Sequence, residues 1–213
     1  MKKGLFISIE GPDGSGKSTQ IAALKEYFEQ KGMDVVLTRE PGGTAIGEKI
    51  REIILDKNNQ EMDDMTEALL YAAARAQHVA QIIKPALMAG RTVICDRFID
   101  SSIAYQGYGR QLGDCVRIIN EYAVRGCMPD ITFLLKMDPK IGKSRIRDEE
   151  QDRLELEKLE FHQRVYEGYV EMEKAFNRIV GIDAARSIQE ISADIIAQIE
   201  AVLQEDGRNR NDL

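Results

Sequence analysis

The sequence predicts an α/β fold in which helices cover both faces of a five-stranded parallel sheet. Short apolar runs alternate along the chain with longer stretches of helical periodicity, a pattern typical of parallel strands joined by crossover helices. Each run is nearly continuous in apolar residues, as expected for strands that are buried on both faces. A length of 213 residues suits one domain, which we expect to span residues 1–205, followed by a polar tail at 206–213.

The predicted strands are short runs rich in aliphatic residues, at 5–10, 34–38, 92–96, 131–136 and 178–183. The predicted helices have apolar residues three and four apart, at 17–31, 44–55, 65–88 and 114–125, from near Pro139, up to about 176, and from Ser187 onward. Gly32 is placed to cap the first helix, and Ser187 with Glu190 forms a capping box on the last. On the long helix, the predicted buried stripe contains Met65, Leu69, Ala72, Ala76, Val79 and Ile83.

Residues 11–18, GPDGSGKS, match the phosphate-loop pattern GxxxxGK(S/T). The motif follows a predicted strand and opens a predicted helix, a setting in which glycines let backbone N–H groups turn toward phosphate oxygens. Lys17 would reach the β- and γ-phosphates of ATP, and the Ser18 hydroxyl would ligate Mg²⁺. The motif therefore predicts a P-loop NTPase fold. The residues predicted to bind the nucleotide are Gly11, Pro12, Asp13, Gly14, Ser15, Gly16, Lys17, Ser18 and Thr19.

Asp13 is a carboxylate inside a loop that holds an anion. Aspartate favours turns, so a solvated turn residue is one interpretation. A carboxylate beside a triphosphate is electrostatically unfavourable unless it has a partner of its own. Acceptance of a hydrogen bond from a neutral sugar hydroxyl is the second interpretation, and the loop by itself leaves both open.

Two further pairs suggest a second ligand. Asp96 and Arg97 end the third predicted strand, and ligands of parallel sheets bind beyond the carboxyl ends of strands. We expect Asp96 to bind the Mg²⁺ shell through water and Arg97 to bind a second phosphate, the alternative being a surface ion pair. Tyr71 and Arg75 share one face of the long helix, about 100° from its apolar stripe. They could bind a planar base, or be a flanking tyrosine with a solvated arginine.

Residues 143–158 are almost wholly charged and carry Arg145, Arg147 and Arg153. A solvated helix face is the ordinary interpretation of such a run. Beside a phosphate loop, the alternative is a short arginine-bearing lid that closes over ATP, stabilises the transferring charge and excludes water.

The chain has two histidines, His78 and His162, and no obvious pair of base and nucleophile. A kinase acting on an alcohol needs a base for the hydroxyl proton, whereas a phosphate acceptor is already anionic. Bringing two anions together calls for lysine, arginine and Mg²⁺. The residues present therefore favour a nucleoside-monophosphate kinase over a sugar or protein kinase.

The bulk composition argues against several other classes. A net charge of −7 disfavours general nucleic-acid binding. Three cysteines without metal-like spacing indicate reduced thiols in a cytoplasmic protein. The apolar run near the N-terminus is too short for a signal-peptide core, and no apolar stretch has the roughly 18 residues that a membrane span needs.

Five segments together resemble the bacterial thymidylate kinase (dTMP kinase) family: GPDGSGKST, TREPGGT, EALLYAAARAQHV, CDRFIDSSIAYQGYGR and DRLE. Their order and spacing match from about residue 5 to residue 203. The resemblance implies Mg²⁺-dependent phosphorylation of dTMP to dTDP by ATP, for dTTP synthesis. It also implies a homodimer that acts on this small molecule and not on nucleic acid or a membrane.

The family's roles fall on matching residues of this chain. Asp13 would bind the 3′-hydroxyl of the acceptor deoxyribose, Tyr71 would stack on thymine, Arg75 would read the base, and Arg97 would bind the acceptor phosphate. The other acceptor-site residues that the resemblance implies are Ser102 and Gln106 beside thymine, Tyr105 beside the sugar 2′ position, and Glu40 and Arg51.

Gly14 follows the loop acid and the arginines lie in 143–158, so the chain resembles the bacterial type, in which lid arginines reach the phosphates. Arg147 is favoured for that role and Arg153 is second. Tyr71 stands where the family usually has phenylalanine, and Phe98 where tyrosine or histidine is common. The residues predicted to act in catalysis are Lys17, Arg97, Arg147, Arg153 and Asp13.

Two rival functions are compatible with a phosphate loop. A deoxynucleoside kinase has a related fold but needs a base near the 5′-hydroxyl, a role that neither Asp13 nor the TREPGGT segment fits. A nucleotide-dependent switch would hydrolyse ATP without an acceptor, and its turnover would ignore dTMP. The set of acceptor residues argues against the switch.

Overall fold

The computed structural model describes residues 3–145 and 152–208. The strands are β1 (Phe6–Glu10), β2 (Val35–Arg39), β3 (Thr92–Asp96), β4 (Ile131–Lys136) and β5 (Ile179–Asp183). They form one five-stranded sheet in the order β2-β3-β1-β4-β5, and every pair of neighbours is parallel. The predicted α/β class with a five-stranded parallel sheet is confirmed.

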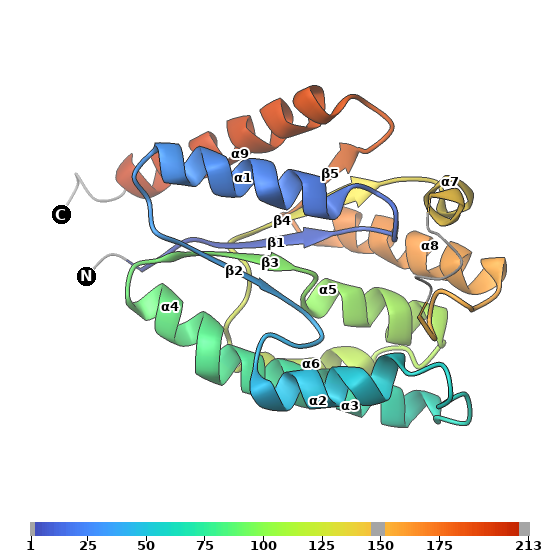
Figure 1. Ribbon diagram of the computed structural model, residues 1–213. Helices are drawn as coiled ribbons and strands as arrows, with labels where there is room; N and C mark the ends of the chain where they lie inside the picture. Colours follow the sequence, from blue (N-terminus) through green and yellow to red (C-terminus); the bar gives the residue numbers. More distant parts are fainter. Residues whose placement is uncertain (1–2, 146–151, 209–213) are drawn as a thin grey trace.

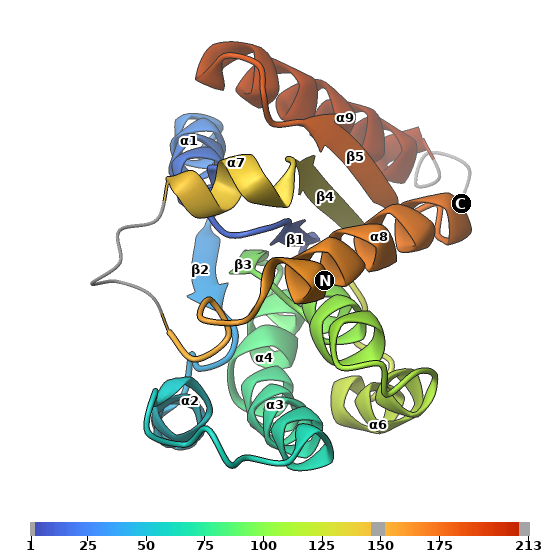
Figure 2. The ribbon, with the colours of Figure 1, turned by 90° about the vertical axis from the view of Figure 1, so that its right-hand side faces the viewer.

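The helices surround this sheet on both faces. They are α1 (Lys17–Gln30), α2 (Ala45–Leu55), α3 (Asp64–His78), η1 (Val79–Ile83), α4 (Lys84–Met88), α5 (Ile99–Ser102), η2 (Ile103–Gly109), α6 (Cys115–Val124), α7 (Pro139–Ser144), α8 (Leu159–Ala175) and α9 (Ile188–Arg208). Figure 1 shows α1 and α9 above the sheet and α3, α4 and α6 below it. Figure 2 shows α8 crossing the same lower face. In the described residues, no helix is long and apolar enough to span a membrane.

The central strand explains the continuous apolar pattern. Ile7 and Ile9 of β1 pack into the cluster formed with α1 and α9, whereas Phe6 packs on the opposite face with Phe98. Both faces of β1 are therefore buried, as expected for a parallel strand between two layers of helices.

Two predicted helix ends are confirmed. Gly32 follows α1 with a φ of 68°, the left-handed conformation that glycine adopts without strain. At the start of α9, the Ser187 N–H donates to Glu190 Oε2 at 3.0 Å and the Glu190 N–H donates to Ser187 Oγ at 3.3 Å. These two bonds satisfy backbone donors that the first helical turn would otherwise leave unpaired.

The predicted stripe on the long helix was only partly right. Ala72, Val79 and Ile83 are buried, but Leu69 is 50% exposed. The inward face of α3 carries buried polar side chains beside its buried alanines, and among them Arg75 is paired with Glu40. The helix also departs from one regular α-helix, since the π-helical segment η1 separates α3 from α4.

The segment from Ile99 to Gly109 was not predicted as helical. It forms α5 and the π-helical η2, and most of its side chains are buried. Polar residues and two glycines obscure any apolar repeat there, and a π-helical turn does not follow the spacing of 3.6 residues on which the prediction depends. This missed helix carries Ser102, Tyr105 and Gln106.

Candidate functional site

A cavity of about 470 Å³ lies where β1 and β3 end and α1 begins. It gathers residues from distant parts of the chain, as expected at the carboxyl edge of a parallel sheet. The predicted site residues that line it are Asp13, Gly14, Gly16, Lys17, Ser18, Thr19, Glu40, Arg51, Tyr71, Arg75, Asp96, Arg97, Tyr105 and Gln106. Those that the structure describes away from the lining are Gly11, Pro12, Ser15, Ser102 and Arg153.

The phosphate loop owes its shape to glycines at strained positions. Gly11, Gly14 and Gly16 have φ values of 137°, 75° and 92°, which side chains rarely tolerate. A Cβ on Gly14 would lie 2.4 Å from the carbonyl oxygen of Gly142 in α7. Lys17 Nζ donates to the carbonyls of Gly11 at 3.1 Å and Pro12 at 3.0 Å. The lysine thus folds back over its own loop, at the N-terminus of α1.

Asp13 is not a solvated turn residue. Its carboxylate accepts hydrogen bonds from Arg97 Nη2 at 2.6 Å and from the Tyr105 hydroxyl at 3.1 Å, and Lys17 Nζ lies 3.7 Å away. Burial raises the pKa of Asp13, but Arg97 and Lys17 outweigh it and hold that pKa well below the usual range. Asp13 is therefore ionised at neutral pH and faces two cations.

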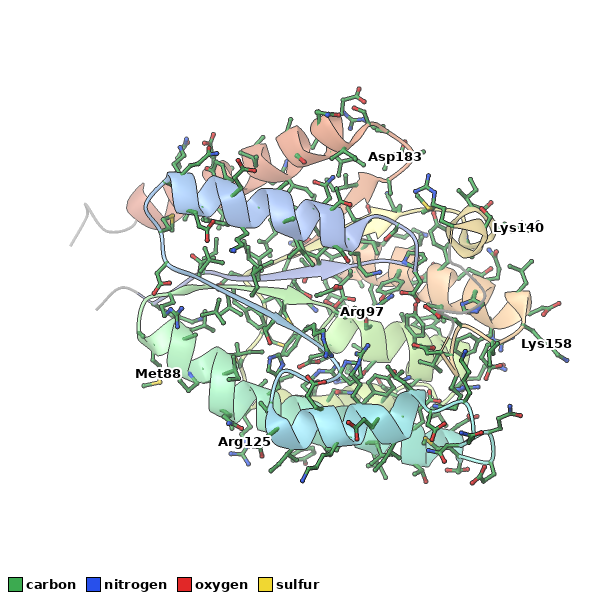
Figure 3. The ribbon with its side chains drawn as sticks, viewed as in Figure 1. Met88, Arg97, Arg125, Lys140, Lys158 and Asp183 are labelled. Carbon is green, nitrogen blue, oxygen red and sulfur yellow. The ribbon has the colours of Figure 1, made fainter. Side chains whose placement is uncertain are left out.

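Arg97 occupies an unusual backbone position directly after β3 (Figure 3). Its φ of 65° is left-handed, which costs a residue other than glycine about 1–3 kcal/mol. Its guanidinium Nη1 lies 3.2 Å from Ser101 Oγ and 3.3 Å from the Tyr169 hydroxyl, and its plane stacks over the Tyr105 ring at 5.2 Å. Strain of this kind persists where the surroundings fix one geometry.

Arg75 is an interior residue, contrary to the solvated alternative. Only 1% of its side chain is exposed. It donates to Glu40 Oε2 at 2.7 Å, to Ser102 Oγ at 2.8 Å and to the Phe98 carbonyl at 2.9 Å. A further short bond reaches Asn120 Oδ1. These partners come from three separate parts of the chain and hold the guanidinium in place beside the cavity.

Glu40 links Arg75 to a buried histidine. Its second oxygen lies 2.9 Å from His78 Nδ1, and His78 Nε2 lies 2.6 Å from Thr38 Oγ1. Each buried polar group in this chain of contacts therefore has a partner, which low-dielectric surroundings demand.

Gln106 presents an unpaired acceptor. Its Nε2 donates to Glu67 Oε1 at 2.8 Å, which fixes the amide orientation, because a carboxylate needs a donor. Its Oε1 is buried and has no hydrogen-bond partner among the described residues. Since Gln106 lines the cavity, an N–H group of a ligand would complete it.

The predicted lid arginines have three different fates. Arg147 lies outside the described residues. Arg153 turns away from the phosphate loop, because it is 7% exposed and donates to the Ile54 carbonyl at 2.8 Å and to Glu67 Oε2 at 2.5 Å. Arg145 is the one described lid arginine that touches the loop, since its Nη1 donates to the Gly14 carbonyl at 3.2 Å.

Sequence reasoning missed several residues at the site. Asp152 and Glu155 line the cavity, and burial together with Asp152 raises the pKa of Glu155 to about 7. Asn120 completes the partners of Arg75 from α6. The acids are hidden in a run of charges and the asparagine is a single polar residue in an amphipathic helix, so no pattern pointed to any of the three.

The residues predicted to hold Mg²⁺ fit that ion modestly. Ser18 and Asp96 both line the cavity, and Asp96 Oδ1 is a buried carboxylate oxygen without a hydrogen-bond partner in the described part of the chain. No group of three or more acidic, histidine or cysteine side chains converges there within the described residues. Such sparse ligation suits Mg²⁺, which keeps several waters and binds substrate phosphates.

This geometry defines the class: a P-loop nucleotide-binding protein in which an arginine, Arg97, pairs with the loop acid Asp13. A family model described as thymidylate kinase matches residues 9–195, so the chain belongs to the thymidylate kinase family.

Curated relatives agree over nearly the full length. The chain is 50% identical to the thymidylate kinase of Geobacillus sp. (strain WCH70), over 92% of this chain and 96% of that protein. It is also 50% identical to the thymidylate kinases of Exiguobacterium sp. (96% and 98% covered) and Pediococcus pentosaceus (94% and 99% covered).

Proposed function

We propose that this protein transfers the γ-phosphoryl group of ATP to dTMP, giving dTDP and ADP, for dTTP synthesis. The observation that best supports this reaction is that Lys17, Arg97 and Arg75 all line one cavity. A monophosphate whose base contacts Arg75 would therefore present its phosphate near the loop, and such proximity supplies much of the rate of a phosphoryl transfer. Membership of the family and the names of its relatives support this reaction.

The donor side would work through the loop and α1. Backbone N–H groups at the N-terminus of α1 would face the phosphates of ATP. Lys17 would leave the carbonyls of Gly11 and Pro12 and bind the β- and γ-phosphates. Mg²⁺ would be held by the Ser18 hydroxyl and, through water, by Asp96. The ion would neutralise charge on the donor phosphates.

The acceptor phosphate would bind Arg97, with Arg51 as a second cation at the cavity wall. No base is required, because the attacking oxygen is already anionic. The ion pair between Arg97 and Asp13 would loosen as the phosphate arrives, because the phosphate would compete with the Asp13 carboxylate for the guanidinium donors. Asp13 would then accept a hydrogen bond from the 3′-hydroxyl of the acceptor sugar and keep donor loop and acceptor in register.

Other residues of the cavity would contact the base and the sugar of the acceptor. Tyr71 would stack on thymine, and the free Oε1 of Gln106 would accept from a base N–H. Arg75 would donate to a base carbonyl by exchanging one of its present protein partners for it. Tyr105, buried beside Asp13, would leave no room for a 2′-hydroxyl. Ser102 and Glu40 would act through Arg75, because both contact its guanidinium; Glu40 also lines the cavity, whereas Ser102 does not.

We propose a homodimer, which the family resemblance implies and which exposed apolar residues on three neighbouring helices support. The helices α2, α3 and α6 lie side by side (Figure 2). Their exposed large apolar residues are Ile46, Ile53, Leu69, Ile118 and Tyr122, each at least 45% accessible. Such a face is typical of a protein interface. Leu69→Glu should convert the dimer to a monomer in sedimentation analysis, whereas a wild-type monomer would contradict the assignment.

The remaining assignments concern organisation and location. We place residues 1–205 in one domain, and residues 143–158 in a lid. Of its arginines, Arg145 and Arg147 would serve the phosphates, whereas Arg153 is bonded to Ile54 and Glu67. Free thiols at Cys95, Cys115 and Cys127 agree with a reducing cytoplasm. The acceptor is a small molecule, and the acidic surface does not favour nucleic acid.

The test is ADP release from ATP and Mg²⁺, coupled to NADH oxidation, with no acceptor and then with dTMP, dUMP, thymidine, UMP or dGMP. We expect strong stimulation by dTMP, weaker stimulation by dUMP, and little by the others. Removal of Mg²⁺ with a chelator should abolish turnover.

The other outcomes assign the rival functions. Stimulation by thymidine instead of dTMP would identify a nucleoside kinase. Turnover that ignores every acceptor would identify a nucleotide-dependent switch and contradict the proposed reaction.

A further inference from the structure

Glu10 is a fully buried carboxylate directly behind the phosphate loop. It is the last residue of β1, has 0% exposure and does not line the cavity. Four donors nevertheless converge on it. They are the Phe98 N–H at 2.7 Å, Ser8 Oγ at 3.1 Å, Ser101 Oγ at 2.5 Å and the Tyr169 hydroxyl at 3.1 Å. A carboxylate with so many donors is held in one orientation.

Two hydrogen bonds to residues of β1 fix the backbone conformation of Arg97. The Arg97 N–H donates to the Ile9 carbonyl at 3.0 Å, and the next N–H, that of Phe98, donates to Glu10 Oε1. These bonds lie on either side of the left-handed residue, whose φ is 65°. A strained conformation persists only when neighbouring contacts determine it, and Glu10 supplies one of the two.

Two hydroxyl groups connect the Glu10 carboxylate to the guanidinium of Arg97 through hydrogen bonds. Ser101 Oγ and the Tyr169 hydroxyl both contact Glu10 Oε2, and both lie within 3.3 Å of Arg97 Nη1. Ser101 has a single proton, which it donates to Glu10. Its oxygen can therefore accept from the guanidinium, and it also lies 2.9 Å from the Tyr169 hydroxyl. An uncharged amide in place of the carboxylate would offer N–H groups to these hydroxyls and turn their protons toward Arg97.

We propose that Glu10 is a positioning residue for the acceptor phosphate, which it serves by fixing the backbone and guanidinium of Arg97. This inference rests on the proposed function, in which Arg97 binds that phosphate. It predicts that loss of the Glu10 charge weakens binding of a phosphate-bearing acceptor and leaves the nucleoside without phosphate unaffected.

A direct charge effect would have the opposite sign. Glu10 is negative, so its removal would strengthen phosphate binding if it acted only through space. Asp100 supplies a matched control, because it is equally buried and acts electrostatically on Glu10. Its own partners are Arg178 and Thr132, not Arg97. The other charged or titratable groups that act on or feel Glu10 are Lys17, Cys95, Tyr169 and Arg178.

The experiment is calorimetric titration of wild type, Glu10→Gln, Asp100→Asn and Arg97→Ala with dTMP and with thymidine, at a pH above 7, where Glu10 is ionised. For Glu10→Gln we expect dTMP to bind about tenfold more weakly, and thymidine to stay within about twofold of wild type. Asp100→Asn should change both ligands alike. Arg97→Ala should bind dTMP about a hundredfold more weakly and should bind thymidine as wild type does.

The outcomes separate this inference from the function on which it rests. If Arg97→Ala shows no loss selective for dTMP, the role of Arg97 is wrong. If Arg97→Ala shows that loss but Glu10→Gln binds dTMP normally or more tightly, or weakens both ligands equally, Glu10 does not position Arg97. Should Glu10→Gln fail to fold, Tyr169→Phe removes only a bridging hydroxyl. It should weaken dTMP about threefold selectively, and no selective loss would overturn the inference.

Discussion

Two arginines line the same cavity and differ in how their charge is balanced. The Arg75 side chain is 1% exposed, and protein groups already occupy its donors. The Arg97 side chain is 16% exposed and has one carboxylate partner, Asp13, whose own side chain is 32% exposed. Arg75 is built into the interior, whereas Arg97 keeps a partner that a ligand can replace.

This difference indicates that Arg75 mainly stabilises the fold, whereas Arg97 is available to bind a ligand. A buried ion pair leaves an uncompensated charge when one member is removed, which strongly destabilises a protein. The pair of Arg97 and Asp13 at the cavity wall, whose side chains are 16% and 32% exposed, can exchange its carboxylate for a phosphate at lower cost, because water still reaches both groups. The base side should therefore be rigid before any ligand binds, and the phosphate side should rearrange on binding.

The largest expected effect is on the rigid side. Arg75→Ala should lower the free energy of unfolding by about 3–5 kcal/mol, because Glu40 is left buried without its cation. Urea denaturation measures this change directly. Arg75→Ala combined with Glu40→Gln should recover part of the loss, whereas a single variant as stable as wild type would remove the contrast between the two arginines.

Arg97→Ala should affect activity rather than stability. We expect kcat/KM for dTMP to fall by about a hundredfold or more, as loss of charge-assisted bonds to a phosphate does. The unfolding free energy should change by less than about 1.5 kcal/mol, since Asp13 keeps Lys17 as a neighbour. Steady-state kinetics with matched denaturation curves tests both. An Arg97 variant that unfolds as readily as the Arg75 variant would make the two residues equivalent.

Glu10, behind the phosphate loop, makes the free energy of unfolding depend on pH. Burial, with Asp100 nearby, raises its pKa from 4.5 to about 7, so the folded protein binds this proton more tightly than the unfolded chain does. Its contribution to stability is full below the unfolded pKa and is lost as the pH rises through about 7.

The matched measurement is chemical denaturation of wild type and Glu10→Gln between pH 5 and pH 7.5. Wild type should lose about 2 kcal/mol relative to the variant over this range. Parallel curves for the two proteins would show that Glu10 is already ionised at pH 5 and would remove this term.

The smallest effect should come from Asp13 and the acceptor sugar. Asp13→Ala should weaken dTMP about tenfold through loss of one hydrogen bond to the 3′-hydroxyl. It should not weaken 3′-deoxythymidine monophosphate, which lacks that hydroxyl. Equal losses for the two acceptors would mean that Asp13 acts on Arg97 alone.

The sequence allowed prediction of the phosphate side far better than the base side. The loop pattern and the strand-end position of Arg97 are local signals, and local signals survive folding. Arg75 was placed off the core, because an arginine between apolar neighbours gives no hint that Glu40, Ser102 and Asn120 will meet it from other elements. Leu69 was placed in the core for the same reason, since periodicity assigns a face by composition and not by the partner that covers it.

Glu10 shows the limit most clearly. At the end of an apolar strand it has the appearance of an ordinary charged boundary residue. Its four donors come from β1, from the turn after β3, from α5 and from α8, and only the folded chain brings them together. The helical segment over Ile99–Gly109 was missed because π-helical turns have no simple apolar repeat.

The most direct test of phosphoryl transfer to an anionic acceptor is phosphorus NMR of the product formed from ATP, Mg²⁺ and dTMP. Attack by the phosphate oxygen should yield a nucleoside diphosphate, seen as two mutually coupled phosphorus signals besides those of the adenine nucleotides. Two uncoupled signals would mean transfer to the 3′-hydroxyl instead, with Asp13 as a base. Inorganic phosphate with unchanged dTMP would mean hydrolysis, and either result would contradict the assignment of Arg97 to the acceptor phosphate.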